Sequence, residues 1–156
     1  MAVNPVKAPG KKGDWVTPVA LVGGGVMLLG GAYLILKKPP GVKPGGTVKA
    51  VFGFDYAEDE GDFVFQVSLG NILVFEPWFD HLPGMTFVKT ETIPASPLDS
   101  NGFHIPQRQA VEVECPLPAA TVAKAYDAEA LIRTPSMAEF DYLVKKVTKD
   151  AVRVVE

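Results

Sequence analysis

The chain has 156 residues, of which 47% are hydrophobic, and a formal net charge of -3. The charge is uneven, because residues 1–46 carry six lysines against one acid, Asp14, whereas residues 47–156 carry nine Lys or Arg against 17 Asp or Glu. About 110 residues after the N-terminal part suit one compact domain and are too few for two. An acidic domain repels a phosphate backbone, which argues against nucleic-acid binding.

An uncharged apolar run of 22 residues occupies positions 15–36 and ends at Lys37-Lys38-Pro39-Pro40. As a helix it would be roughly 33 Å long, which matches a hydrocarbon core of about 30 Å. The run is longer than the apolar core of a cleaved signal peptide, and its two lysines are typical of a stop-transfer flank. We therefore predict a basic tail over 1–14, a retained single-pass transmembrane helix over 15–36, and the lipid bilayer as a partner. We expect the following domain on the outer face of a cell envelope or virion.

Small residues share one face of this predicted helix, namely Ala20, Gly24 and Gly31. Such spacing lets two helix backbones approach closely. We expect contact with another copy of the chain or with a neighbouring membrane or structural protein; the alternative is that glycine is merely tolerated there.

Residues 37–46 contain three prolines and three glycines, a composition typical of an extended linker. From Thr47 onward apolar residues recur with a period of two, which indicates strands. Strands are predicted at 47–56, 62–69, 71–76, 85–93, 109–115, 125–133 and 142–154, with a polar turn at 57–61. Residues 136–146 could instead form a short helix, because Ser136 and Glu139 resemble a capping box. The pattern predicts an all-β, antiparallel β-sandwich domain over 47–156.

Candidate metal ligands gather at the first turn. They are Asp55, Glu58, Asp59, Glu60 and Asp62. Carboxylates suit Ca²⁺, but their order lacks an EF-hand pattern and a solvated hairpin tip is the favoured interpretation. His81 and His104 have no second ligand at a zinc-binding spacing. No catalytic or cofactor motif occurs, so we expect no cofactor and no enzymatic activity.

Three further features remain open in the sequence. An apolar group at 75–85 either covers an open end of the sandwich or forms a contact patch for a partner subunit or the membrane surface. Its members are Phe75, Trp78, Phe79, Leu82 and Met85. The connection 94–109 is either a binding loop or a mobile segment. Cys115, the one cysteine, lies in an alternating stretch and is expected to be a small buried hydrophobe.

The segment LPAATVAKAYDAEALIRTP, residues 117–135, resembles the late strands of immunoglobulin-like and fibronectin-type domains. The resemblance implies that Tyr126 occupies the tyrosine-corner position and that Ala128, Ala130 and Ile132 point inward. It implies a fold and leaves the function open.

A second, shorter likeness lies at the N-terminus. Lys11-Lys12-Gly13 followed by Asp14-Trp15 is similar to the class III signal sequences of archaeal type IV pilin-like proteins. It implies an alternative in which the chain is a filament subunit whose hydrophobic helix packs in a filament core.

The layout as a whole is similar to that of small membrane-associated structural proteins of prokaryotes or their viruses. We accordingly expect a non-enzymatic, membrane-anchored β-sandwich that acts as a structural, assembly or adhesion and binding module at a cell or virion surface.

Overall fold

The structure is a computed structural model that describes residues 19–22, 26–29, 32–35, 41–73 and 78–156. These residues form strands and connecting turns and include no helix, so the all-β prediction is confirmed for this part of the chain. The strands are β1 (Val19–Val22), β2 (Val26–Leu29), β3 (Ala32–Ile35), β4 (Gly41–Val42), β5 (Thr47–Tyr56), β6 (Gly61–Ile72), β7 (Phe79–Ile93), β8 (Gln107–Pro116), β9 (Ala125–Arg133) and β10 (Val144–Val154).

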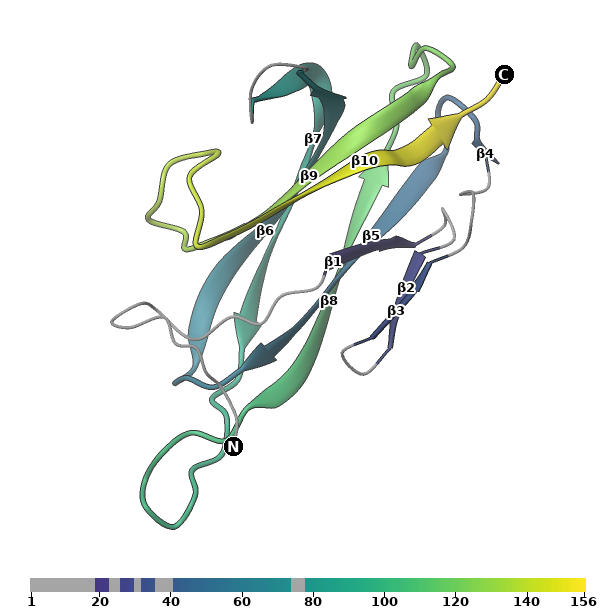
Figure 1. Ribbon diagram of the computed structural model, residues 1–156. Coiled ribbons are helices and arrows are strands. Elements are labelled where there is room, and N and C mark those ends of the chain that lie inside the picture. Colours follow the sequence, from purple (N-terminus) through teal and green to yellow (C-terminus); the bar gives the residue numbers. More distant parts are fainter. Residues whose placement is uncertain (1–18, 23–25, 30–31, 36–40, 74–77) are drawn as a thin grey trace.

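Two sheets face each other across one core (Figure 1). The larger has the order β4-β10-β9-β6-β7 and the smaller the order β1-β5-β8, while β2 and β3 pair separately. Neighbouring strands are antiparallel except β4 and β10, which run parallel with Gly41 opposite Arg153. The mostly antiparallel arrangement agrees with the alternating pattern of the sequence, since one face of each strand is directed at the core.

The alternation in β5 explains how the two layers join. Its even-numbered residues from Val48 to Tyr56 are all buried, as a strand with one face on a core requires. The rings of Phe52 and Phe54 meet Phe65 of β6, with centroids 5.2 and 5.8 Å apart. Because β5 and β6 belong to different sheets, this aromatic group links the layers and contributes area burial plus favourable ring geometry.

Most strand bounds follow the predictions, with three exceptions. β7 begins at Phe79, six residues before the predicted start at 85. β5 and β9 span the predicted 47–56 and 125–133. The separate strand expected at 71–76 is wrong, because residues 71–72 continue β6. The alternative helix at 136–146 is also wrong: turns occupy this stretch, Phe140 has φ 67°, which a right-handed helix excludes, and β10 begins at Val144.

The described residues cover only part of the predicted transmembrane helix. Between 15 and 36 the structure describes β1, β2 and β3, and β1 pairs with β5 with Val19 opposite Phe52. Residues 15–18, 23–25, 30–31 and 36 are not among those described, so the helix stays a prediction. Among the described residues no helix has the length and apolar character needed to cross a bilayer.

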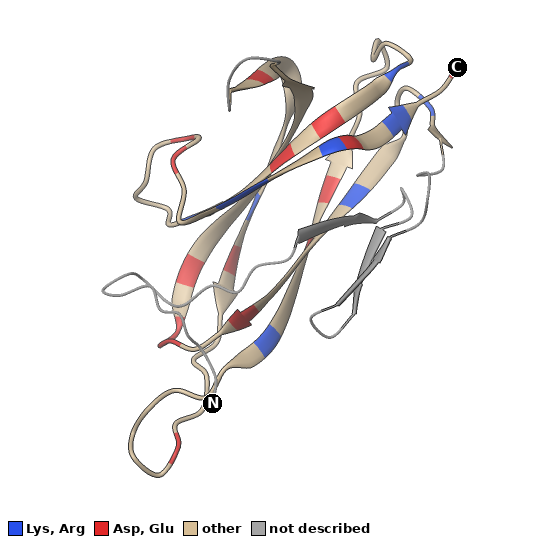
Figure 2. Ribbon diagram, viewed as in Figure 1, with Lys and Arg blue, Asp and Glu red and all other residues tan. Residues whose placement is uncertain are grey.

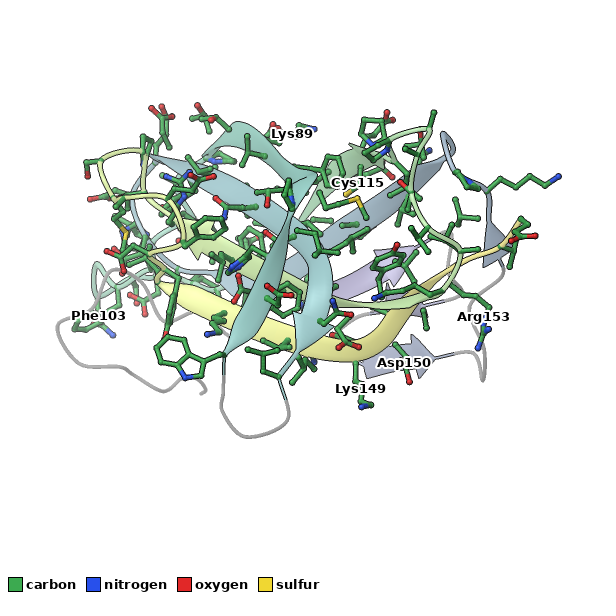
Figure 3. All side chains as sticks on the ribbon, turned by 90° about the horizontal axis from the view of Figure 1, so that it is seen from above. Lys89, Phe103, Cys115, Lys149, Asp150 and Arg153 are labelled. Atoms are coloured by element: carbon green, nitrogen blue, oxygen red, sulfur yellow. The ribbon has the colours of Figure 1, made fainter. Side chains whose placement is uncertain are left out.

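The domain has two ends of different construction. Residues 41–46, which follow the predicted span, meet residues 117–124 at one end, where Leu117 N donates to Gly46 O at 2.8 Å and Gly45 N to Pro118 O at 3.3 Å. We call this the linker end. The turn 57–60 (the distal turn) and the connection 94–106 (the distal loop) form the distal end, and the ten residues of β5 separate the two by roughly 33 Å. Phe103 of the distal loop and Arg153 beside the linker lie on opposite sides of the molecule in Figure 3.

Candidate functional site

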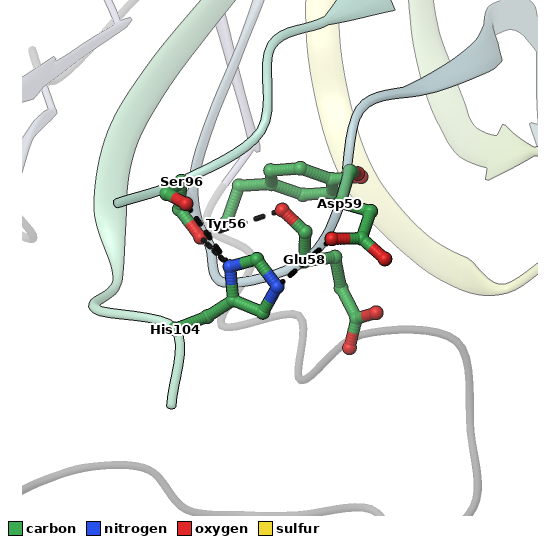
Figure 4. Close-up of polar contacts among 5 residues, drawn as sticks. All are labelled: Tyr56, Glu58, Asp59, Ser96 and His104. Atoms are coloured by element: carbon green, nitrogen blue, oxygen red, sulfur yellow. Dashed lines mark hydrogen bonds and ion pairs between the residues drawn. The ribbon is translucent and has the colours of Figure 1, made fainter. Parts of the chain in front are cut away.

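The distal turn and the distal loop are held together by polar contacts (Figure 4). Ser96 N donates to Glu58 O at 3.0 Å, and Tyr56 supports the turn from below by donating its hydroxyl hydrogen to Asp59 O. Burial, followed by the negative charges of Glu58 and Asp59, raises the pKa of Tyr56 to about 12. The phenol therefore remains a hydrogen-bond donor throughout the neutral pH range.

His104 fastens the loop to the turn. Its Nδ1 lies 3.0 Å from the carbonyl oxygen of Ser96 and 2.9 Å from Ser96 Oγ, while its Nε2 lies 3.1 Å from Asp59 Oδ1. Both ring nitrogens are thus within hydrogen-bond distance of an oxygen. The His104 side chain bridges two segments that lie 45 residues apart in the chain.

These contacts bring the side chains of Ser96, His104 and Asp59 together, and we call these three residues the clasp. The order of their contacts differs from that in a catalytic triad. In a catalytic group the serine faces Nε2 and a buried aspartate holds Nδ1. Here Nδ1 is engaged with the Ser96 carbonyl, Nε2 faces the aspartate, and the Asp59 side chain is 93% exposed. Ser96 itself is buried. The arrangement positions the loop and offers no activated nucleophile at the surface.

Inside the distal loop, Asp99 fixes the backbone around Phe103. Asp99 Oδ1 accepts from Asn101 N at 2.8 Å and from Phe103 N at 3.0 Å, and Asp99 N donates to Phe103 O at 2.8 Å. Gly102 has φ +85°, a conformation that glycine adopts without strain. Ile105 N closes the loop by donating to Pro97 O at 2.7 Å. Sequence reasoning left this segment open between a binding loop and a mobile one, and the structure gives it a defined, hydrogen-bonded shape.

Three large apolar side chains project from this loop. Leu98 is 57% exposed, Phe103 70% and Ile105 41%. Scattered exposed hydrophobics are ordinary, and these three are grouped here because they lie within eight residues of one ordered loop. We call these three residues the apolar tip.

A pocket of about 200 Å³ lies beside the clasp. It is lined by two aromatic residues and an acidic turn: Tyr56, Phe63, Glu58, Asp59, Glu60 and Gly61. Tyr56 and Phe63 pack edge to face, with ring centroids 5.7 Å apart. Carboxylates around aromatic rings make an environment that favours a cationic group.

The acidic residues considered as calcium ligands have separate neighbours. Asp55 pairs with Arg108 at 3.3 Å, Asp62 accepts from Thr92 Oγ1 at 2.5 Å, and Asp59 binds His104. Within residues 41–73 and 78–156, no three His, Cys, Asp or Glu side chains converge as a metal site would require. Asp55, Asp59 and Asp62 thus contact three different residues.

The apolar group predicted around residues 75–85 is divided by the structure. Phe79 and Met85 are buried and Trp78 is 64% exposed, while Phe75 lies outside the described residues. Leu82 and Met85 meet Tyr126 and Pro118 in a pocket at the linker end. These two residues cover that end of the sandwich, which matches the first of the two interpretations left open by the sequence.

Tyr126 is buried near the start of β9, and its hydroxyl donates to Val122 O at 2.7 Å, four residues earlier in the chain. The resemblance of this segment to immunoglobulin-like strands stays an expectation. Ala128, Ala130 and Ile132 belong to the core cluster, as expected. Cys115 is fully buried, and burial, followed by the charge of Glu114, raises its thiol pKa to about 12. The prediction of a small buried hydrophobe is confirmed.

Sequence reasoning missed the partners of both histidines, because each lies far away in the chain. Besides His104, His81 Nε2 donates to Glu129 Oε1 at 2.6 Å, and Lys145 Nζ lies 3.7 Å from Glu129 Oε2. The available signal was the alternation of Asp127 and Glu129 with core residues in β9. A strand buried on both faces must pair its acids, and Asp127 indeed accepts from the backbone nitrogen of Ile72 at 2.7 Å.

The helix-packing residues predicted in the apolar run are not tested. Ala20 lies in β1, opposite Val51, and nothing further is described for its side chain. Gly24 and Gly31 lie outside the described residues.

Comparison with known proteins assigns no relative: no protein-family model, no curated protein and no solved structure matches the chain. The distal end is therefore interpreted from its own geometry.

Proposed function

We propose that the chain is a non-enzymatic, membrane-anchored immunoglobulin-like domain that makes structural, assembly or adhesion contacts at a cell or virion surface. The observation that carries this proposal is the opposite placement of the linker and the ordered, apolar-tipped distal loop. A domain tied to a bilayer at its linker end would hold this loop away from the bilayer, where other proteins are met.

The order of the strands supports the immunoglobulin-like part of the proposal. If β5 and β8 are taken as strands B and E, then β10, β9, β6 and β7 follow the order G, F, C and C′ of such sandwiches. Tyr126 then lies near the start of strand F, where a tyrosine corner belongs. Phe65 on the strand-C equivalent fills the centre of the core in place of the usual tryptophan, and a single cysteine excludes the inter-sheet disulfide.

The anchor rests on the 15–36 run and its lysine flank. The described fold adds that Gly41 and Val42 pair with β10, so residues 37–40 would join a span over 15–36 to the domain; the pairing of β1 with β5 could not coexist with such a span. A linker of this length would keep the linker end close to the bilayer. The charge distribution is compatible with this placement, since Lys43, Lys124 and Arg153 belong to the segments that meet at this end and cations suit anionic headgroups.

Alkaline carbonate extraction of membranes containing the full chain tests the proposal. Wild type is expected to stay in the membrane pellet, and the double substitution Leu28→Arg with Leu29→Arg to move to the supernatant, because each arginine in mid-span costs about 3 kcal/mol. The control is Val122→Arg, which changes an exposed residue of the domain and leaves the anchor intact. Release of the wild-type chain by carbonate would refute the anchor.

A further inference from the structure

We propose that the distal end binds a protein partner whose contact surface is an apolar pocket surrounded by lysine or arginine side chains. The inference deepens the proposed function, because it names the contact surface and the partner's chemistry. It rests on two neighbouring features, which are the apolar tip and the pocket lined by Tyr56, Phe63 and the acidic turn. Asp59 connects them, because it lines the pocket and contacts His104 of the distal loop.

The apolar tip has the properties of a binding anchor. Phe103 is the most exposed of the large hydrophobic residues in the described chain, at 70%. Its backbone nitrogen and oxygen are both held by Asp99, so little conformational freedom remains to be lost when a partner closes over it. Aromatic residues that enter a pocket at the centre of an interface commonly dominate its binding energy.

The charge around the tip defines the partner. Glu58, Asp59, Glu60 and Asp99 lie on the two segments that form this end, and Figure 2 shows acidic residues on both. Arg108 pairs with Asp55, and His104 contacts Asp59, so both already have an acidic partner at this end. A cationic rim on the partner would complement this field and speed encounter.

The pocket beside the tip fits a single cationic side chain. Three of its six lining residues are acidic, whereas Tyr56 and Phe63 are only 2% and 7% exposed, so the carboxylates supply the attraction for a guanidinium or ammonium group. We therefore expect a Lys or Arg on the partner close to the apolar residue that receives Phe103. An anionic bilayer is disfavoured as the target, because it repels the same carboxylates.

The test uses the full chain in nanodiscs of zwitterionic phosphatidylcholine, panned against a random peptide library displayed on phage. Enriched peptides are expected to combine Lys or Arg with an aromatic or large aliphatic residue. Their affinity, measured by fluorescence polarisation, is expected to fall about tenfold or more with Phe103→Ser and again with Glu60→Gln. Val122→Ser, an equally exposed site at the linker end, should bind like wild type.

Three results would overturn the inference: no enriched peptide, enrichment without cationic residues, or equal binding by Phe103→Ser. Ile105→Ser serves as a second tip variant in case the first disturbs the loop, and a retained circular dichroism spectrum shows that each variant is folded. If the nanodiscs cosediment with phosphatidylserine vesicles and Phe103→Ser abolishes this, the target is an anionic membrane and the proposal of a protein partner is wrong. None of these outcomes changes the carbonate result, so failure of the contact surface and failure of the anchor remain distinguishable.

Discussion

Apolar side chains cover the core at the linker end of the domain, whereas at the distal end they are exposed to solvent. At the linker end Leu82, Met85 and Tyr126 close over the core, and the loop 117–124 is tied to the chain that leads towards the predicted anchor. At the distal end Phe103 and its neighbours are held in the solvent by an ordered loop. The same sandwich therefore uses one end to complete its core and the other to present side chains that the core does not need. Changes at the linker end should cost stability, whereas changes at the distal end should cost contact.

The largest effect is expected at the linker end. Tyr126→Ala removes a buried ring and its hydroxyl bond to Val122 O, and should lower the free energy of unfolding by about 3–5 kcal/mol. Tyr126→Phe, which keeps the ring, should lower it by about 1 kcal/mol. Urea denaturation of the full chain followed by circular dichroism measures both. The matched distal change, Phe103→Ala, should leave the midpoint almost unmoved, and a comparable loss there would remove the distinction between the ends.

A Gly→Ala substitution near each end compares how closely the backbone is packed there. A Cβ at Gly70 would lie 2.0 Å from Asp80 O in the β6–β7 hairpin, which Lys124 ties to the linker end through Asn71. Gly70→Ala should therefore cost about 3 kcal/mol. Gly102 in the distal loop has no atom within 4 Å of such a Cβ, so Gly102→Ala should cost only the positive-φ penalty of about 1 kcal/mol. Thermal melting of both variants checks the order, and the reverse order would contradict it.

Asp99 tests whether the distal loop is fixed by its own bonds. Asp99→Ala removes the acceptor of two backbone amides, so the amides of Asn101 and Phe103 should exchange with solvent about tenfold faster. Hydrogen exchange in the core strands should stay unchanged, because the loop contributes little to the core. Asp141→Ala, in a turn elsewhere, is the control. An unchanged exchange rate at Phe103 would show that other contacts hold the loop.

The smallest effect at neutral pH concerns Cys115, because this effect appears only at alkaline pH. Its pKa is raised to about 12 in the folded chain, mainly by burial, so folding favours the neutral thiol. This contribution to stability is complete below the ordinary thiol pKa near 9 and falls as pH rises from there towards 12. Cys115→Ala should therefore show a shallower alkaline decline in unfolding free energy than wild type. Identical slopes from pH 9 to 11 would contradict the burial of this thiol.

The sequence predicted the strands more completely than the site. Period-two alternation located β5 and β9 to the residue, because one face of each strand must be apolar to meet the core. In the segment from Leu117 to Tyr126, the Tyr126 hydroxyl donates to Val122 O, so both partners of this hydrogen bond lie four residues apart in the sequence. Alternation within a strand and a hydrogen bond within one segment can be predicted from the sequence, because the residues involved are close together in the chain.

The contacts of the clasp could not be predicted from the sequence, because Asp59 lies far from the other two residues in the chain. His104 and Asp59 are 45 residues apart, and only the pairing of β5 with β8 and of β6 with β7 brings them together. Within the apolar group at 75–85, Phe79 and Met85 are buried, whereas Trp78, which precedes β7, is exposed. Neither outcome depends on residue type alone.

The relation of the two ends to the bilayer is the central claim, and site-specific quenching tests it most directly. Phe103→Cys and Val122→Cys place a label on side chains that are 70% and 65% exposed, one at each end, while Cys115 is buried and unreactive. With the full chain in bilayers that carry a nitroxide on the lipid headgroups, the label at 122 should be strongly quenched and the label at 103 almost unaffected. Equal quenching at both positions, or stronger quenching at 103, would contradict the account.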